Sequence, residues 1–430
     1  MKKIIMIFAV CFSWGQFCGL GWSVEGGADS RSLKSGSACS DTKAKSDYTV
    51  ACYYFPNWGP RGESEWKKLE NAKPRFAGHQ QPKVPVWGIQ NEREPAVMAQ
   101  KIDAAADYGI DSFIFDWYWY DNGPYLERCL EDGYLKALNN KRIKFSVMWC
   151  NHDAGGKRTG RYGAVKPETF EKMTDYVVKN YFSHPSYWKI DGCPYFSIYQ
   201  LFNLVKTFGG EQETIKALER FRGKVKAAGF PDLHLNVVCF GIRPEGLLGE
   251  NPGLKVDSLT SYVWVHHIPL TDFPSMQYED IGDAYFRSLY EGGAYNGLQK
   301  PVIHSKVPYH PNVMMGWDAS PRCGQPGPLT AGRAYPCGPV VVGNTPGAFK
   351  KALLRAEKFL EASGHRQKIV TIYAWNEWTE GGYLEPDTVN KMEYLQAVKD
   401  VFGDNNGLKS KAKIKGKPLS TSCGQNQTGP

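Results

Sequence analysis

The chain has 430 residues, of which 42% are hydrophobic and 22% charged, proportions close to those of an ordinary globular protein. Its formal net charge is +8, but five of the lysines behind that excess lie between residues 409 and 417, in a C-terminal tail without acidic residues. Without this tail the charges nearly balance, so the sequence argues against a nucleic-acid partner.

Aromatic residues are the unusual part of the composition, since they make up 13% of the chain and include 13 Trp. Sugar rings present flat C–H faces rimmed by hydroxyls, so sites that bind them combine aromatic faces with polar side chains. A carbohydrate substrate would explain the excess. Burial in the core is the alternative for each aromatic residue taken singly.

The N-terminal residues have the order of a secretory signal peptide, with two lysines ahead of an apolar run over residues 4–12. The run is too short to cross a bilayer as a helix, so we expect no stable membrane span. We predict a signal peptide over residues 1–22, a flexible linker over 23–46, and an exported protein that is periplasmic, on the cell surface or secreted. A lipid anchor on Cys11 or Cys18 is the alternative, although the residues before each cysteine match that signal poorly.

The cysteine spacing indicates one disulfide and no metal site. The chain has 11 cysteines, and removing the two in the predicted leader leaves an odd number, so at least one thiol should be free or paired with another molecule. Cys323 and Cys337 flank a loop rich in Gly and Pro and are the expected disulfide. No group of Cys and His residues has zinc-ligand spacing, and we predict neither a metal nor another cofactor.

From Tyr48 onward, short apolar runs alternate with amphipathic helical patterns. The expected strands are, in chain order, Thr49–Phe55, Ile110–Phe115, Ile143–Met148, Tyr195–Tyr199, Leu235–Cys239, Ser258–Val263, Val302–Val307 and Ile369–Tyr373. The expected helices are Pro95–Asp107, Pro167–Tyr181, Glu211–Ala228, Tyr278–Tyr290 and Gly347–Glu361.

This alternation predicts one (β/α)8 TIM-type barrel as the catalytic domain, over residues 47–404, with long loops at its C-terminal face. Residues 405–430 are expected to form a basic, disordered tail. An open, doubly wound sheet is the alternative, but no Gly-rich phosphate-binding turn follows the first expected strand.

Aromatic and polar residues gather after the expected strands, where a barrel has its active site. The second strand is followed by Asp116, Trp117 and Trp119, the third by Trp149, Asn151 and His152, the sixth by Trp264, and the eighth by Asn376, Glu377, Trp378 and Glu380. The loop over residues 308–346 is too long for a simple connection and adds three candidates for a substrate wall, Trp317, Asp318 and Arg322. We predict that these residues line a carbohydrate site, with Trp117 and Trp119 pointing to opposite sides of their strand. Loop bracing is the alternative for Asn151 and His152, and a buried Asp318–Arg322 pair that fixes the loop is the alternative for those two residues.

Glu377 and Glu380 are the predicted catalytic pair. Glycoside hydrolysis needs one carboxyl group to protonate the leaving oxygen and a second to act as base or nucleophile, and crowding helps to keep one of them protonated. The alternative is that both are ordinary loop carboxylates. Asp116 is expected to bind a sugar hydroxyl or to replace Glu377 as the base, with a structural hydrogen bond as its alternative.

Five segments in order along residues 53–401 make the chain resemble the glycoside hydrolase family 99-like group, which includes endo-α-mannosidases and polysaccharide-associated bacterial proteins. The segments are Phe115-Asp116-Trp117-Tyr118-Trp119-Tyr120, Trp149-Cys150-Asn151, His184-Pro185-Ser186-Tyr187-Trp188, Gly316-Trp317-Asp318-Ala319-Ser320-Pro321-Arg322 and Ala374-Trp375-Asn376-Glu377-Trp378-Thr379-Glu380-Gly381.

The resemblance implies a (β/α)8 barrel that cleaves an α-glycosidic bond with retention of configuration. It further implies that Glu377 removes the proton of the sugar's 2-hydroxyl, which attacks the anomeric carbon to give an epoxide-like intermediate, while Glu380 acts as general acid and then base. The chain departs from the family at Thr379, where the mannosidases have His, and at His152, where the group often has Glu. These departures put the choice of sugar in doubt.

The sequence therefore predicts an exported, monomeric glycoside hydrolase that acts on an oligo- or polysaccharide. Two other classes remain open at this stage, a glycosyltransferase-like protein of polysaccharide assembly and a non-catalytic glycan-binding protein. The predicted export signal and the lack of a phosphate-binding loop argue against the first. The intact pair of Glu377 and Glu380 argues against the second.

Overall fold

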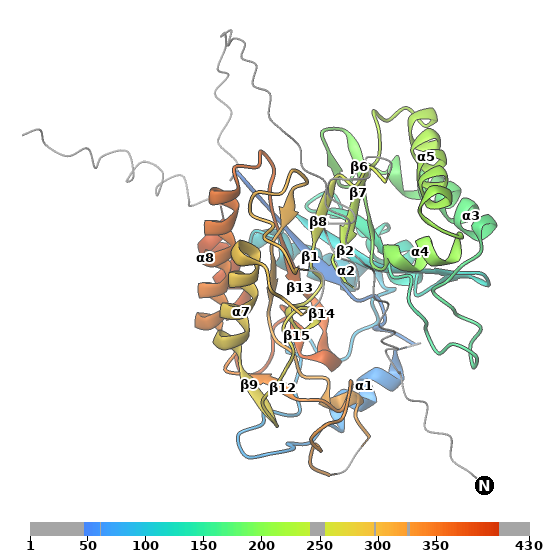
Figure 1. Ribbon diagram of the computed structural model, residues 1–430. Coiled ribbons are helices and arrows are strands. Elements are labelled where there is room, and N and C mark those ends of the chain that lie inside the picture. Colours follow the sequence, from blue (N-terminus) through green and yellow to red (C-terminus); the bar gives the residue numbers. More distant parts are fainter. Residues whose placement is uncertain (1–46, 61, 241–253, 296–297, 325–326, 404–430) are drawn as a thin grey trace, which may run out of the picture. The chain divides into compact units, whose positions relative to one another are not determined.

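The alternating apolar runs of the sequence pair as parallel strands in the computed structural model (Figure 1), which describes residues 47–60, 62–240, 254–295, 298–324 and 327–403. All of these residues belong to one unit, Ala44–Pro430. The predicted signal peptide (1–22), linker (23–46) and basic tail (405–430) lie outside the described residues.

Nine parallel strands of the described residues form a nearly closed barrel, which confirms the predicted fold class. Around the barrel they follow the order β10 (Tyr309–His310), β8 (Ser258–Thr260), β7 (His234–Val238), β6 (Cys193–Ile198), β4 (Lys144–Trp149), β2 (Ser112–Tyr120), β1 (Tyr48–Tyr54), β13 (Lys368–Tyr373) and β11 (Asn312–Met314).

The two end strands of this order, β10 and β11, follow each other in the chain and are joined by a single residue, Pro311. Proline has no N–H to donate, which divides this stretch into two short strands. β10 pairs with β8 on one side and β11 pairs with β13 on the other, and the carbonyl of Pro311 accepts a bond of 3.0 Å from Thr371 N.

Helices alternate with the strands and cover the outside of the barrel. They are α1 (Glu63–Glu70), α2 (Pro95–Asp107), the π-helix η1 (Cys129–Tyr134), α3 (Pro167–Val177) with the π-helix η2 (Val178–Phe182), α4 (Leu201–Thr207), α5 (Glu211–Ala227), α7 (Tyr278–Glu291), α8 (Pro346–Ser363) and α9 (Glu393–Phe402). In Figure 1, α7 and α8 lie side by side, whereas α3 and α5 cover the other side of the strands. Among the described residues, no helix is long and apolar enough to cross a membrane.

Short pairs extend this scaffold at its edges and loops. They are β3 (Gly123–Tyr125) on β2, β5 (Lys189–Ile190) on β6, β9 (Ser275–Gln277) with β12 (Val340–Val342), and β14 (Asn376–Glu377) with β15 (Gly382–Tyr383). Three 3₁₀ turns complete the elements: η3 (Trp264–His266), η4 (Ser320–Arg322) and η5 (Trp378–Glu380).

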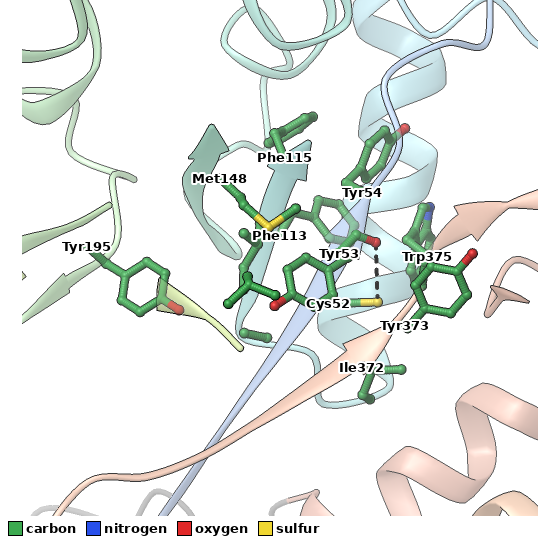
Figure 2. Packing of buried hydrophobic residues seen from close by; sticks show 14 of the residues in the cluster. Cys52, Tyr53, Tyr54, Phe113, Phe115, Met148, Tyr195, Ile372, Tyr373 and Trp375 are labelled. Atoms are coloured by element: carbon green, nitrogen blue, oxygen red, sulfur yellow. Dashed lines mark hydrogen bonds between the residues drawn. The ribbon is translucent and has the colours of Figure 1, made fainter. Parts of the chain in front are cut away.

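The core between the strands and α2 is aromatic (Figure 2). The ring of Tyr54 packs on Phe113 and Phe115 with centroids 5.0 and 4.7 Å apart, and Phe113 packs on Trp375 at 5.0 Å. These rings are buried, and burying each is worth about 2 kcal/mol. Part of the aromatic excess in the composition therefore serves packing.

The expected strand Val302–Val307 is wrong. The N–H groups of Val302 and Ile303 donate to the carbonyl of Leu289, near the C-terminal end of α7, so this apolar run lies along a helix end. The seventh barrel strand is instead the stretch divided by Pro311, which the sequence analysis placed inside the loop over residues 308–346. The second strand also continues five residues beyond its expected end at Phe115, because β3 pairs with its last three residues.

Candidate active site

The segment after β13 folds back on itself and presents both predicted catalytic residues. β14 and β15 form an antiparallel pair in which Glu377 lies opposite Gly382, and η5 makes the turn between them. Gly381 has φ +72°, and a Cβ there would lie 2.9 Å from the backbone nitrogen of Asp318. Only glycine fits this turn without strain, so the short spacing Glu-Trp-Thr-Glu becomes a tight, buried loop.

Arg322 joins the two carboxylates. Its Nη2 donates to Glu377 Oε1 at 2.6 Å, and its Nη1 donates to Glu380 Oε1. Arg322 comes from η4, in the loop after the seventh strand, and its guanidinium lies over the ring of Phe55 at 5.7 Å. One predicted site residue thus holds the predicted pair together.

Two phenols complete the surroundings of Glu380. Tyr373, the last residue of β13, donates to Glu380 Oε2 at 2.5 Å, and Tyr335 donates to Glu380 Oε1 at 2.7 Å. Every oxygen of this carboxylate therefore accepts a charge-assisted or phenolic hydrogen bond, which orients it firmly. Neither tyrosine was among the site residues predicted from the sequence.

Asp116 supplies a third carboxylate, on β2, and is 2% exposed. Its Oδ2 accepts a bond of 2.7 Å from the hydroxyl of Tyr262, whereas its Oδ1 is buried without a hydrogen-bond partner. Burial raises the pKa of Asp116 well above its usual range, the bond from Tyr262 opposes the rise, and the charge of Glu380 adds to it. A buried acceptor left open in this way is available to a ligand hydroxyl.

The same causes act on Glu377, which is 3% exposed. Burial raises its pKa well above the usual range, Arg322 opposes the rise, and the negative charges of Glu380 and Asp116 add to it. Such a group takes up a proton readily at neutral pH, as a general base or a general acid must.

Glu65 of α1 is a contact that sequence reasoning missed. Its Oε2 accepts from Arg322 Nε at 3.0 Å and from the hydroxyl of Thr379 at 2.8 Å. Burial raises its pKa, but Arg322 and Lys68 outweigh that effect and lower it to about 2. Glu65 looks like any acidic residue near the start of an amphipathic helix, so no local signal could have identified it.

Two predicted site residues within the turn, Asn376 and Trp378, anchor it to neighbouring segments. Asn376 bonds the backbone nitrogen and oxygen of Phe55 at 2.8 and 2.9 Å, and Trp378 is buried and donates to Glu385 at 2.7 Å. Lys101 of α2 lies 2.5 Å from both Glu92 and Glu385, so a buried cation ties this turn to the helix layer. Neither Asn376 nor Trp378 contacts the carboxylate pair by a hydrogen bond described here.

Several predicted sugar-binding residues face the helices or brace loops. Trp117 and Trp119 lie on the same side of β2 with centroids 5.5 Å apart and pack on Tyr181 and Tyr176, so the expected opposite orientation is wrong. Residues two apart in a strand share a face. Three other predicted residues also make structural contacts. Trp149 packs on Phe170, and Trp264 packs on Tyr278 and Tyr285. Asn151 forms hydrogen bonds with the backbone of Gln200.

His152 and Trp317 do lie with the site. Trp317 packs at 6.1 Å on both Tyr335 and Tyr373, the two phenols that bond Glu380. His152 contacts Tyr118 and Tyr199 at 5.8 and 5.6 Å. A cluster of partly exposed rings, which the sequence analysis missed, continues from there at the ends of the strands: Tyr199, Phe240, Tyr262 and His266.

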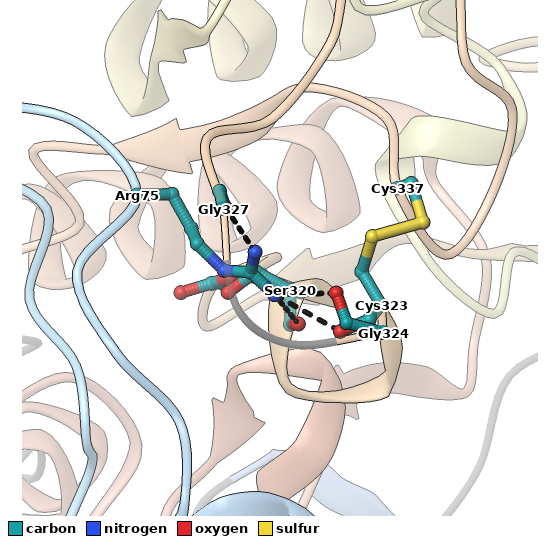
Figure 3. Close-up of a disulfide and its surroundings, with 7 residues drawn as sticks. Arg75, Ser320, Cys323, Gly324, Gly327 and Cys337 are labelled. Carbon is teal, nitrogen blue, oxygen red and sulfur yellow. Dashed lines mark hydrogen bonds between the residues drawn. A yellow bond between two sulfur atoms is a disulfide. The ribbon is translucent and has the colours of Figure 1, made fainter.

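The loop that carries Arg322 is cross-linked by the disulfide Cys323–Cys337, as predicted (Figure 3). Arg75 donates to carbonyl groups of the same loop, including Cys323 O at 2.9 Å. Asp318 accepts a hydrogen bond from Gln81 at 2.7 Å and pairs with His79 at 2.8 Å, so it fixes the loop. Among the described residues, it forms no hydrogen bond with Arg322.

Free thiols are also present, as the odd cysteine count predicted: Cys52, Cys129, Cys150 and Cys193. In the part of the chain that the structure describes, no group of three or more His, Cys, Asp or Glu side chains is arranged to hold a metal ion.

Comparisons with known proteins agree with this architecture. The sequence model of a family described as glycosyltransferase WbsX matches residues 56–398. An uncharacterised protein, WxcX, from Xanthomonas campestris pv. campestris (strain B100) is 25% identical over 377 residues, which are 82% of this chain and 49% of the relative. The chain thus spans about half the length of the curated relatives it matches.

Two solved structures share the fold. One is the family 99 endo-α-mannosidase of Bacteroides thetaiotaomicron, solved in complex with BIS-TRIS-propane, with a TM-score of 0.51 and 15% identity over 86% of this chain and 100% of that enzyme. The other is described as a glycoside hydrolase-like protein, with a TM-score of 0.54 and 16% identity over 84% of this chain and 95% of that protein. At this identity the likeness shows a barrel resembling those of glycosidases.

Proposed function

The chain belongs to the WbsX family, whose description names a glycosyltransferase, and we propose that this member instead hydrolyses a glycosidic bond. One observation carries the proposal. Glu377 and Glu380, three residues apart on a buried turn, are held together by Arg322 at the end of the last barrel strand. Two buried carboxyl groups in different surroundings are what the cleavage of a glycosidic bond requires.

We assign Glu380 as the general acid and then base. In this role Glu380 starts with a proton on Oε2, the oxygen beside the hydroxyl of Tyr373, and Glu377 starts as the carboxylate that Arg322 stabilises. It first donates its proton to the glycosidic oxygen, and the bond from that oxygen to the anomeric carbon breaks. Glu377 meanwhile accepts the proton of the sugar's 2-hydroxyl, whose oxygen bonds to the anomeric carbon. Water then attacks this carbon, gives its proton to Glu380, and the 2-oxygen regains its proton from Glu377. The bond is thus hydrolysed with retention, and both residues return to their starting states.

Asp116 is proposed to orient the sugar. Its unpartnered Oδ1 can accept a hydrogen bond from a hydroxyl, and Tyr262 holds the other oxygen at 2.7 Å. Aromatic faces nearby, among them Trp317 and Tyr199, offer surfaces on which a sugar ring can stack. The substrate class is therefore a glycan, and the resemblance to endo-α-mannosidases supports an α-linkage.

Transfer from a nucleotide sugar is the second candidate, because the family description names it. Such a donor carries a diphosphate, whereas the guanidinium of Arg322 is already paired with three carboxylates, Glu65, Glu377 and Glu380. The acidic balance of this site repels a diphosphate, which supports hydrolysis over transfer.

We also propose that the protein is exported, because residues 1–22 have the order of a signal peptide. Sequencing the N-terminus of the protein recovered from the periplasm or medium tests this. An uncut N-terminus on protein found only in the cytosol would contradict export.

The function is tested by incubating the purified chain with a panel of bacterial, fungal and plant polysaccharides and analysing the released sugars by mass and linkage. For a substrate that is cleaved, the anomer formed first is read by proton NMR, and retention is expected. Glu380→Ala and Glu377→Gln should each lower turnover by about a thousandfold or more.

Glu393→Gln is the matched control, because Glu393 is an exposed carboxylate at the start of α9. It should keep the activity of the unmodified chain. Wild-type turnover in both active-site variants would refute the hydrolase, and so would sugar transfer from a nucleotide sugar without hydrolysis. Calorimetric binding of a glycan without product after long incubation would indicate a binding protein.

A further inference from the structure

Glu65 and Thr379 extend the hydrogen-bond network of Arg322, which also donates to the hydroxyl of Tyr335 at 2.8 Å, although neither Glu65 nor Thr379 was predicted as a site residue from the sequence. Thr379 lies in the chain between the two proposed catalytic residues, and its side chain is fully buried. Its hydroxyl donates to Glu65 Oε2 at 2.8 Å, and Arg322 Nε donates to the same oxygen at 3.0 Å. The turn that presents the catalytic pair is thus linked to α1.

The guanidinium of Arg322 serves three carboxylates at once. Nε contacts Glu65, Nη2 contacts Glu377, and Nη1 contacts Glu380. A guanidinium has five N–H donors in a rigid plane but only one positive charge. Three carboxylates therefore face one positive charge, and the negative charge of Glu65 offsets part of the stabilisation that Arg322 gives to the other two.

We propose that Glu65 is a positioning residue that draws part of the Arg322 charge away from Glu377 and Glu380, and that Thr379 determines how strongly it does so. Calling Glu377 and Glu380 catalytic rests on the proposed function. The contacts that join these two residues to Arg322, Glu65 and Thr379 do not depend on it. The hydroxyl of Thr379 stabilises the negative charge of Glu65 independently of Arg322. Without this hydroxyl, the stabilisation of the Glu65 carboxylate would come more from the guanidinium of Arg322.

This sharing has a measurable effect on Glu377. Burial raises the pKa of Glu377, Arg322 lowers it, and Glu380, Asp116 and Glu65 raise it further. The other titratable side chains close to Glu377 are the phenols of Tyr118 on β2, Tyr373 on β13 and Tyr262 after β8, and the thiol of Cys150 after β4. Removing the charge of Glu65 leaves all of these groups in place, so the pKa of Glu377 should fall.

The test is a carbon NMR titration of the full chain, carrying ¹³C-labelled Glu carboxyl groups, without any sugar. The Glu377 signal is assigned from its loss in Glu377→Gln. Glu65→Gln keeps an acceptor for Arg322 Nε but removes the charge, and should move the Glu377 midpoint down by about 1 pH unit. Thr379→Val keeps the shape but removes the hydroxyl donor, and should move the midpoint up.

Glu63→Gln is the matched control on the same helix. Its side chain is 70% exposed and pairs with Lys67, so its loss should leave the Glu377 midpoint unchanged. An unchanged or raised midpoint in Glu65→Gln, or an equal fall in Glu63→Gln, overturns the proposal. If Glu65→Gln does not fold, Thr379→Val decides, and an unchanged or lowered midpoint there overturns it.

The measurement uses no glycan, so its failure is distinct from a failure of the proposed hydrolysis. A chain that cleaves nothing could still show the two opposite shifts. An active glycosidase could equally show none.

Discussion

Arg322 Nη2 donates a 2.6 Å hydrogen bond to Glu377 Oε1, although 55 residues separate the two in the chain. The arginine comes from the loop after the seventh strand, and the glutamate from the turn after the eighth. The loop and the turn therefore have to be placed correctly together before the carboxylate pair is arranged for reaction.

Arg322→Lys should lower turnover by about a hundredfold, because an ammonium group cannot keep the planar contacts to Glu377, Glu380 and Glu65 at once. The measurement is kcat and KM on the polysaccharide found in the panel. Arg355→Lys is the control, since Arg355 forms a half-exposed pair with Asp283. Equal activity of both variants would mean that the bridging geometry is irrelevant to the reaction.

Asp116→Asn should stabilise the fold at neutral pH while lowering turnover. Burial raises the folded pKa of Asp116 above its unfolded value of about 3.9, so its charge penalises the folded state once the pH exceeds that value. Replacement should therefore add about 1 kcal/mol or more to the free energy of unfolding at pH 8, and nothing below about pH 4.

Urea unfolding of wild type and Asp116→Asn across this pH range measures the difference. Asp283→Asn, at a half-exposed position, is the control and should show no gain with rising pH. A loss of stability for Asp116→Asn at pH 8 would show that this carboxylate serves structure and not binding.

Lys101→Met should destabilise the protein by about 3–5 kcal/mol, because it leaves the buried carboxylates of Glu92 and Glu385 without their shared cation. Lys350→Met removes a half-exposed pair with Asp400 and should cost less than about 1 kcal/mol. Chemical denaturation of both variants at pH 7 gives the comparison. Similar losses would refute a special role for the buried cation behind the turn.

Opening the disulfide should affect the site as well as stability. Arg322 directly precedes Cys323, and Tyr335 lies two residues before Cys337. The disulfide therefore restrains both side chains, and both bond Glu380. The double replacement of both cysteines by Ser should cost about 3 kcal/mol for a loop of this length, and turnover should fall.

Cys193→Ser, which replaces a partly buried free thiol, is the control for the serine substitution. Melting temperature and turnover are compared for the two variants. If the double variant lost stability but kept full turnover, the disulfide would not be needed to hold Arg322 and Tyr335 in place.

Much of the scaffold could be predicted because it depends on local pattern. Alternating apolar runs and amphipathic stretches indicated the barrel, and α2 begins and ends at the residues predicted. The expected strand at Val302–Val307 failed for the same reason, since an apolar run of that length fits a strand or a helix end equally well.

The positions of Glu377 and Glu380 after the last strand also followed from the sequence, as did the disulfide. Burial and chain order determine these features, and both are visible along the chain. Which face of β2 meets the site was decided by tertiary structure. Trp117 and Trp119 pack against the helices, and Asp116, on the other face, meets Tyr262.

Glu65 marks the limit most clearly, because 257 residues separate it from Arg322. Spacing in a sequence encodes helices, strands and turns, whose hydrogen bonds are local or between neighbouring strands. A contact among three carboxylates and one guanidinium exists only after three separate segments have packed. The sequence therefore determined the barrel and the pair of glutamates, and the tertiary structure decided how the charge around that pair is shared.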